Sequence, residues 1–241
     1  MSARILFKSF LVGLAFALLF FAASCIDQKN MILSIDFESK DFSQWRNACG
    51  KCFFSLGNGQ YIERDPKGVN GFSGVYSGGK KRNESASSFL PLDTDLKIEF
   101  SLLFDENFDV ESKGTVAQVI GWQKGCFEGG MFHLRYEKGR WGYWMRNLDA
   151  GHDYISDIKI PKGEWIDVVV DAKFSSKKDG YFFTEIKQGD KTIKYDIIEN
   201  SATFKNCPRG PYIKAGLYGD YKERDLLYVD NVRVSFSRPV K

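Results

Sequence analysis

Short runs of alternating apolar and polar residues recur along the chain and constrain its fold most strongly. At 96–104 every second side chain is apolar, while Lys97, Glu99 and Ser101 lie between. A period of two is typical of a strand with one face in a core and the other in solvent. Further alternating or apolar runs lie at 32–37, 115–122, 131–136, 141–146, 165–174, 181–187, 192–198 and 226–236.

Turn-forming residues separate these runs, as at 137–140, 175–180 and 188–191. No stretch has the spacing of a long helix, and 15% of the residues are aromatic. The sequence therefore predicts an all-β sandwich or jelly roll. No internal repeat or second linker divides it, so we expect one domain.

The first residues have the features of an export signal. A basic start is followed by an apolar segment from Leu11 to Ala23 and a small-residue site that ends at Cys25. We expect residues 1–24 to be a signal peptide with a lipobox-like end, 25–31 a lipidated tether and 32–241 the β-jelly-roll domain. Acylation of Cys25, as by palmitate, would anchor the protein to a bacterial membrane, with the outer membrane or cell surface favoured.

The formal charge argues against nucleic acid as a partner. Cleavage before Cys25 removes Arg4 and Lys8 and lowers the net charge from +3 to +3 − 2 = +1. A nucleic-acid-binding domain is usually strongly basic. We expect a monomer that contacts the membrane through its lipid anchor only and uses no metal or other cofactor.

The four remaining cysteines, Cys49, Cys52, Cys126 and Cys207, fit disulfides in an oxidising compartment better than a zinc or redox site. If the strands that hold Gln118 and Lys214 pair antiparallel with these residues level, Cys126 lies eight residues beyond one and Cys207 seven before the other. Spacing then predicts a Cys126–Cys207 bridge. Cys49 and Cys52 remain as a second bridge or a free pair.

The stretch from Tyr212 to Asp220 has two unlike faces if it is a strand. Ile213, Ala215 and Leu217 would face the core, whereas Tyr212, Lys214, Gly216 and Tyr218 would share the other face. A lysine between tyrosines suits contact with a sugar ring or an acidic polymer. An ordinary solvated strand face is the alternative.

This stretch belongs to a set of motifs that resembles the jelly-roll polysaccharide lyases, namely the heparin-lyase-like, glucuronan-lyase-like and alginate-lyase-like groups. The resemblance runs from about Asp36 to Val234. It implies a concanavalin-like β-jelly roll of two packed antiparallel sheets with a concave groove. The motifs that carry it are 163–170, 180–182, 189–191, 212–218 and 228–234.

The resemblance also implies roles for individual residues. Tyr218 matches the tyrosine that acts as base, acid or both, and Lys214 matches a lysine near the substrate carboxylate. Arg82 matches an arginine in the groove and Gln118 the glutamine of a Gln-x-His strand. Ile120 stands where that motif has its histidine.

β-Elimination of a uronate requires a neutralised carboxylate, a base and a proton for the leaving oxygen. Gln118, Arg82 and Lys214 could serve the first need, and a tyrosine can act as base where nearby cations favour its phenolate. These ingredients suffice for a mechanism in which tyrosine moves the proton. Glu84, with Arg82, belongs either to the groove or to an ordinary interstrand ion pair.

Other candidates are less specific. His133 shares a predicted strand face with Met131 and Arg135 and is either a catalyst or a histidine with a structural partner. Tyr212 and Trp122 are candidate ligand-binding aromatics. His152 is expected in a loop, and Asp149 and Asp153 beside it lack a calcium-loop pattern.

We therefore expect a surface or periplasmic lipoprotein that binds an acidic, uronate-containing polysaccharide and cleaves it by β-elimination. Two alternatives stay open. One is a non-catalytic carbohydrate-binding module or adhesin, which Ile120 favours; the other is a structural envelope lipoprotein.

Overall fold

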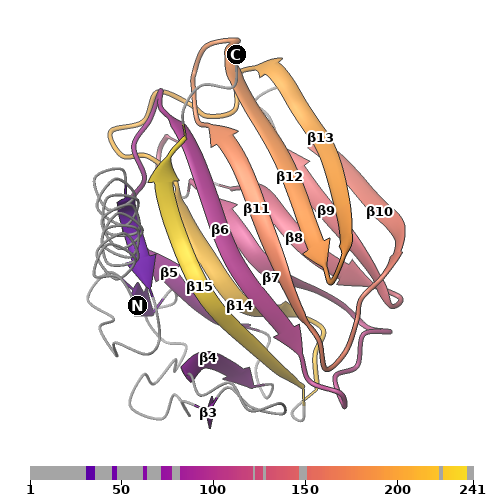
Figure 1. Cartoon of the computed structure of the whole chain (residues 1–241). Coiled ribbons are helices and arrows are strands. Elements are labelled where there is room, and N and C mark those ends of the chain that lie inside the picture. The colour runs from indigo at the N-terminus through magenta and orange to yellow at the C-terminus, as the bar shows by residue number, and fades with distance from the viewer. Residues whose placement is uncertain are drawn as a thin grey trace, which may run out of the picture.

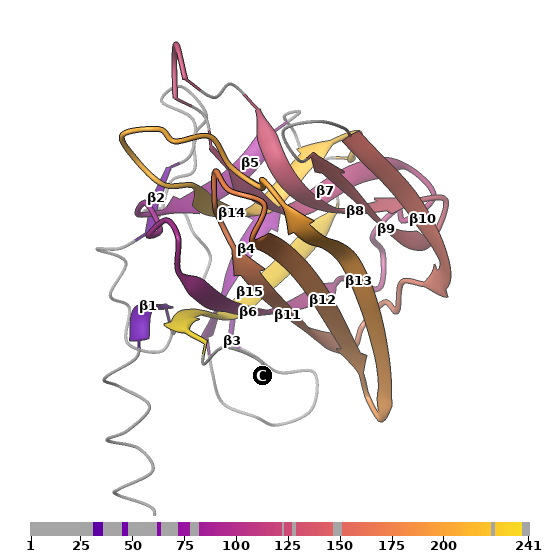
Figure 2. The same cartoon turned by 90° about the horizontal axis from the view of Figure 1, so that it is seen from above.

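A computed structural model describes residues 31–35, 45–47, 62–63, 72–77, 82–121, 123–126, 129–146, 151–222 and 225–237. Every regular element in these ranges is a β-strand, and the strands pair antiparallel in two sheets. Within the same ranges, nothing forms a helix long and apolar enough to cross a membrane. Figure 2 shows the sheets as two layers, one stacked on the other.

The eight-stranded sheet has the order β13-β12-β11-β6-β15-β4-β3, and β1 pairs with β15 beside this path. Its central strands lie at the front in Figure 1. The strand bounds are β1 (Met31–Ile35), β3 (Ile62–Glu63), β4 (Phe72–Ser77), β6 (Asp95–Phe104), β11 (Trp165–Lys173), β12 (Gly180–Gln188), β13 (Lys191–Ser201) and β15 (Leu226–Phe236).

The seven-stranded sheet has the order β10-β9-β8-β7-β14-β5-β2 and lies behind the first in Figure 1. Neighbours in this order come from distant parts of the sequence, since β14 lies between β7 and β5. The strand bounds are β2 (Trp45–Asn47), β5 (Arg82–Ser87), β7 (Lys113–Ile120), β8 (Gly130–Glu137), β9 (Arg140–Arg146), β10 (Gly151–Lys159) and β14 (Tyr212–Gly219).

The core lies between the sheets and is rich in aromatic rings. Phe132 of one sheet stacks on Phe182 of the other with ring centroids 6.1 Å apart, and Phe104 meets Trp141 edge-on at 5.5 Å. All four side chains are buried. Such pairs stabilise the core beyond the area that they bury, so the face of each sheet turned away from this core is the one available for function.

The predicted all-β fold of two packed antiparallel sheets is confirmed. The predicted runs match strands to within a few residues. The main error is β10, because residues around His152 were expected in a loop and instead form an edge strand. Asp153, Tyr154 and Ile155 are all exposed there, so the strand lacks the alternation by which a half-buried strand is recognised.

Candidate functional site

One row of residues crosses the outer face of the seven-stranded sheet at the level of Lys214. Lys214 on β14 is directly opposite Gln118 on β7, and Gln118 is opposite His133 on β8. His133 is in turn opposite Trp144 on β9. The level pairing of Gln118 and Lys214, on which the disulfide prediction depended, is present, and residues from four strands meet in one row.

A second row contains Tyr218. This residue is opposite Arg82 on β5 and Thr115 on β7, and Thr115 is opposite Arg135 on β8. A β-bulge lies between the two rows, because the register of β14 against β7 shifts between Ala215 and Tyr218. Gly216 in this bulge has φ of 130°, a conformation that L-residues with a side chain rarely adopt.

Faces along β14 are as predicted. Ile213, Ala215 and Leu217 belong to the core, whereas Lys214 and Tyr218 do not. Tyr218 is 36% exposed and is the exposed aromatic residue of this strand. Part of this residue is therefore accessible to a large substrate.

Lys214 is not part of an open cationic surface, contrary to the expectation from alternation. Glu84, Gln118 and Lys214 are only 2%, 1% and 4% exposed. The Nζ of Lys214 lies 3.8 Å from Oε2 of Glu84, and Nε2 of Gln118 donates a hydrogen bond to Oε1 of the same carboxylate. Glu84 thus links three adjacent strands, β5, β14 and β7, and is neither a surface ion pair nor an exposed sugar ligand.

Ile120, which stands at the histidine position of the Gln-x-His motif that this strand resembles, lies on the same side of β7 as Gln118. It is opposite Tyr212 on β14, is 7% exposed, and is absent from the core cluster. An apolar side chain packs there, so at this position the face offers no group that transfers a proton.

His133 and Arg135 lie on the β8 part of the face. The ring of His133 meets Trp144 edge-on at 5.0 Å. Arg135 is 8% exposed and contacts two carboxylates, Asp153 at 2.9 Å and Glu137 at 3.3 Å. The charge of Arg135 is thus balanced, and His133 packs against an indole.

Arg135 shares the strand face of His133, as alternation predicts, whereas Trp144 and Asp153 were not predicted as members of this face. Met131 was expected beside His133 and Arg135 but belongs to the core, because the register of β7 against β8 shifts between Val119 and Ile120.

Several predicted residues are described only in part or lie outside the described residues. Arg82 is described in its backbone and register only. Trp122, the lipidation site Cys25 and the pair Cys49 and Cys52 are not described at all. Among the described residues no group of three or more His, Cys, Asp or Glu side chains could hold a metal ion.

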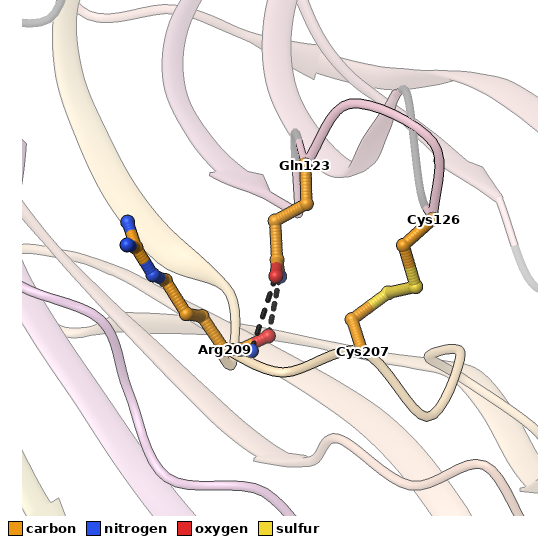
Figure 3. Close-up of a disulfide and its surroundings, with 4 residues drawn as sticks. All are labelled: Gln123, Cys126, Cys207 and Arg209. Atoms are coloured by element: carbon orange, nitrogen blue, oxygen red, sulfur yellow. Dashed lines mark hydrogen bonds between the residues drawn. A yellow bond between two sulfur atoms is a disulfide. The ribbon is translucent and has the colours of Figure 1, made fainter.

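The predicted disulfide between Cys126 and Cys207 is present. It joins the segment after β7 to the segment before β14 (Figure 3). Beside it, the amide of Gln123 contacts the backbone of Arg209 twice: Nε2 donates to the carbonyl, and Oε1 accepts from the backbone nitrogen at 3.0 Å. A covalent bond and two hydrogen bonds therefore hold the two segments together.

Comparison with known proteins gives one family and a set of folds. The family model described as Polysaccharide lyase matches residues 41–233. No curated protein matches the chain.

Three solved structures share the fold. An endo-β-1,4-glucuronan lyase from the fungus Trichoderma reesei has a TM-score of 0.56 and 15% identity over 76% of this chain and 92% of its own. A marine alginate lyase from Aplysia kurodai has a TM-score of 0.52 and 12% identity over 72% of this chain and 86% of its own. A variant of alginate lyase A1-II′ has a TM-score of 0.52 and 17% identity over 82% of this chain and 96% of its own. At these identities the similarity concerns the fold.

Proposed function

Because the chain belongs to the polysaccharide lyase family, we propose that it cleaves an acidic, uronate-containing polysaccharide by β-elimination. Tyr218 is the residue that moves the proton. The observation that carries the proposal is the contrast on one sheet face: Tyr218 is 36% exposed, whereas the neighbouring charged and polar groups of Glu84, Gln118 and Lys214 are buried. Among these four, the tyrosine alone is open to a polymer.

The reaction breaks the C5–H and C4–O bonds and forms a C4=C5 π bond and an O–H bond on the leaving oxygen. Tyr218, as the phenolate, takes the proton from C5 of the uronate, next to the carboxylate. The electron pair of that C–H bond forms the C4=C5 double bond, and the C4–O bond breaks. The phenol then gives its proton to the leaving oxygen, so the tyrosine returns to its starting state and no water is consumed.

The substrate carboxylate needs a positive partner while negative charge develops beside it. Arg82 is directly opposite Tyr218 in the strand register, and we assign it this role. A guanidinium can bind a carboxylate through two parallel hydrogen bonds. Arg135, two strands away, already contacts Asp153 and Glu137.

Lys214, Gln118 and Glu84 act as positioning residues in this proposal. They connect β14, β7 and β5, the three strands that carry Tyr218, Thr115 and Arg82. Their burial leaves little surface for a sugar carboxylate. A buried ion pair whose carboxylate also accepts a hydrogen bond from Gln118 holds neighbouring strands in one relative position, which keeps the tyrosine beside the arginine.

The test is to incubate the protein with glucuronan, alginate, heparin and hyaluronan. Ultraviolet absorbance of the unsaturated uronate reports elimination. We expect at least one polymer to give this product. Binding to a polymer without any increase in absorbance across the panel would contradict the lyase.

A non-catalytic carbohydrate-binding module is the second candidate. The observation that favours it is Ile120, which packs opposite Tyr212 where the family motif has a histidine. The same panel separates the candidates, since a module binds a polymer and releases no unsaturated product.

We also propose that the protein is exported and lipid-anchored through Cys25. The apolar segment that ends in Ala22, Ala23 and Ser24 supports this, as does the Cys126–Cys207 bridge, because disulfides persist in oxidising compartments. Incorporation of labelled palmitate into the wild type and its loss in Cys25→Ser would support the anchor. A soluble, unlabelled wild-type protein in the producing cells would contradict it.

A further inference from the structure

A chain of aromatic and cationic contacts continues from β14 beyond the site. Lys214 Nζ lies 6.0 Å from the ring centroid of Tyr212, and the Tyr212 ring meets Phe89 edge-on at 5.6 Å. The guanidinium of Arg209 lies over the Phe89 ring at 5.2 Å. The contacts therefore extend along the face from the buried lysine to an exposed arginine.

Arg209 differs from Arg135 and Arg140 in its charge balance. Arg135 contacts two carboxylates and Arg140 contacts Asp157. Arg209 is exposed and forms no ion pair with any residue that the structure describes. Its positive charge is thus available to an anion from solution.

The backbone of Arg209 is unusually well held for an exposed loop residue. Gln123 contacts both its backbone nitrogen and its carbonyl, and the Cys126–Cys207 bridge lies next to this contact. Figure 3 shows the Arg209 side chain directed away from the disulfide. The neighbouring backbone is also fixed, because the Leu90 nitrogen donates to the Pro211 carbonyl at 2.6 Å. The guanidinium therefore starts from a preorganised position, which lowers the entropy lost on binding.

We propose that Arg209, Phe89 and Tyr212 form a distal subsite that binds the carboxylate of a second uronate residue, several sugars from the one that is cleaved. This rests on the proposed acidic-polysaccharide function. Tyr212 is six residues from Tyr218, about 20 Å along an extended strand. An aromatic ring packs against the apolar side of a sugar while a guanidinium binds its carboxylate. The subsite favours long, charged polymers.

The binding test uses a Tyr218→Phe background so that polymer is not cleaved during the measurement. Affinities for glucuronan and alginate are measured by affinity electrophoresis, together with the carboxyl-reduced forms of both polymers. Arg209→Gln should weaken binding to at least one charged polymer about tenfold, as expected for a lost charge-assisted contact. Arg209→Lys should lose less affinity than Arg209→Gln, because lysine keeps the positive charge although it lacks the planar guanidinium that binds a carboxylate through two hydrogen bonds.

The matched control is Arg233→Gln, which removes one exposed arginine from β15 in the other sheet. We expect its affinity to stay within about twofold of the background. Gln123→Ala and reduction of the disulfide should weaken binding in the same direction as Arg209→Gln, because both release the Arg209 backbone.

Three results would overturn the subsite: equal affinities for Arg209→Gln and Arg233→Gln, an equal loss with the carboxyl-reduced polymers, or no binding of either charged polymer to the background. The proposed lyase is tested separately, by unsaturated product from the wild type. If that product appears, Arg209→Gln should raise KM for the polymer about tenfold with kcat within about twofold. If the wild type is a lyase and Arg209→Gln leaves KM unchanged, the subsite is disproved and the proposed lyase function stands.

Discussion

Lys214 Nζ lies 3.8 Å from Oε2 of Glu84, and both side chains are almost completely buried in a sheet face that was expected to be open. This relationship moves the lysine from substrate binding to support. The ion pair, with Gln118, joins β5, β14 and β7, and the exposed Tyr218 lies four residues further along β14.

Removal of one member of this pair should destabilise the fold strongly. Lys214→Met leaves the Glu84 carboxylate buried without its cation, and loss of a buried partner usually costs about 3–5 kcal/mol. Urea unfolding measures this change in the free energy of unfolding. The double variant Lys214→Met with Glu84→Gln should lose less than the sum of the two single variants.

The control for the buried pair is Lys113→Met. Lys113 contacts Glu137 at 3.1 Å in the same sheet, but its side chain is 54% exposed. Loss of an exposed pair should cost less than about 1 kcal/mol. Equal losses in the free energy of unfolding for Lys113→Met and Lys214→Met would show that the buried Lys214 pair contributes no more to stability than an exposed pair.

The disulfide should contribute substantially to stability, since Cys126 and Cys207 are separated by 81 residues. A cross-link that closes a loop of this length restricts the unfolded chain by about 4 kcal/mol. Urea unfolding of the Cys126→Ser, Cys207→Ser double variant should show a loss of this size. An unfolding midpoint and slope like those of the wild type would contradict it.

Asp171 should make stability depend on pH. Burial raises the pKa of its carboxyl above the ordinary 3.8; the Lys97 ammonium opposes this, and Glu99 and Glu185 add to it. A folded-state pKa above the unfolded one means that the native protein holds the proton more tightly. Stability is therefore lost as the pH rises through the interval between 3.8 and the raised value.

The variant Asp171→Asn removes this penalty. It should be more stable than the wild type at neutral pH, and the difference should shrink in acid, as thermal unfolding at a series of pH values can show. The control is Asp190→Asn, in the exposed turn between β12 and β13. The stability difference between this variant and the wild type should not grow from acid to neutral pH. A lower Tm for Asp171→Asn at neutral pH would refute the assignment.

Ile120→His tests whether the absent histidine limits the reaction. Ile120 is 7% exposed and lies opposite Tyr212, so an imidazole there would be buried. If Tyr218 both takes and returns the proton, this substitution should leave kcat within about threefold and lower stability modestly. A rise in kcat of more than about tenfold would show that a second proton-transfer group is needed.

Much of the architecture could be predicted because alternation reports which face of a sheet a side chain occupies. The core positions of Ile213, Ala215 and Leu217 followed from this rule. The level pairing of Gln118 and Lys214 was a premise of the disulfide prediction, and the strand register has it. That pairing in turn located the disulfide. Strand β10 was missed because an edge strand with exposed residues on both faces carries no such pattern.

The site was harder to predict because alternation shows which face of a sheet a side chain occupies and does not show how deeply it is buried. It places Lys214 and Glu84 on a face, but their burial and pairing depend on neighbours that come from distant parts of the chain. β-Bulges also break the pattern locally. The bulge at Gly216 shifts the register of β14 against β7, so that Tyr218 lies opposite Thr115. A register shift between β7 and β8 places Met131 in the core.

The central claim is that the exposed phenol of Tyr218 carries the proton in the elimination. The most direct measurement is the rate at which unsaturated uronate appears from the polymer that the wild type cleaves best, compared for Tyr218→Phe and His133→Ala. Loss of a group that transfers a proton should lower kcat at least about 100-fold in Tyr218→Phe while its affinity for the polymer is retained. His133→Ala should stay within about threefold of the wild type, because His133 packs against Trp144. A Tyr218→Phe variant with wild-type kcat, or a His133→Ala variant that is inactive though folded, would contradict the account.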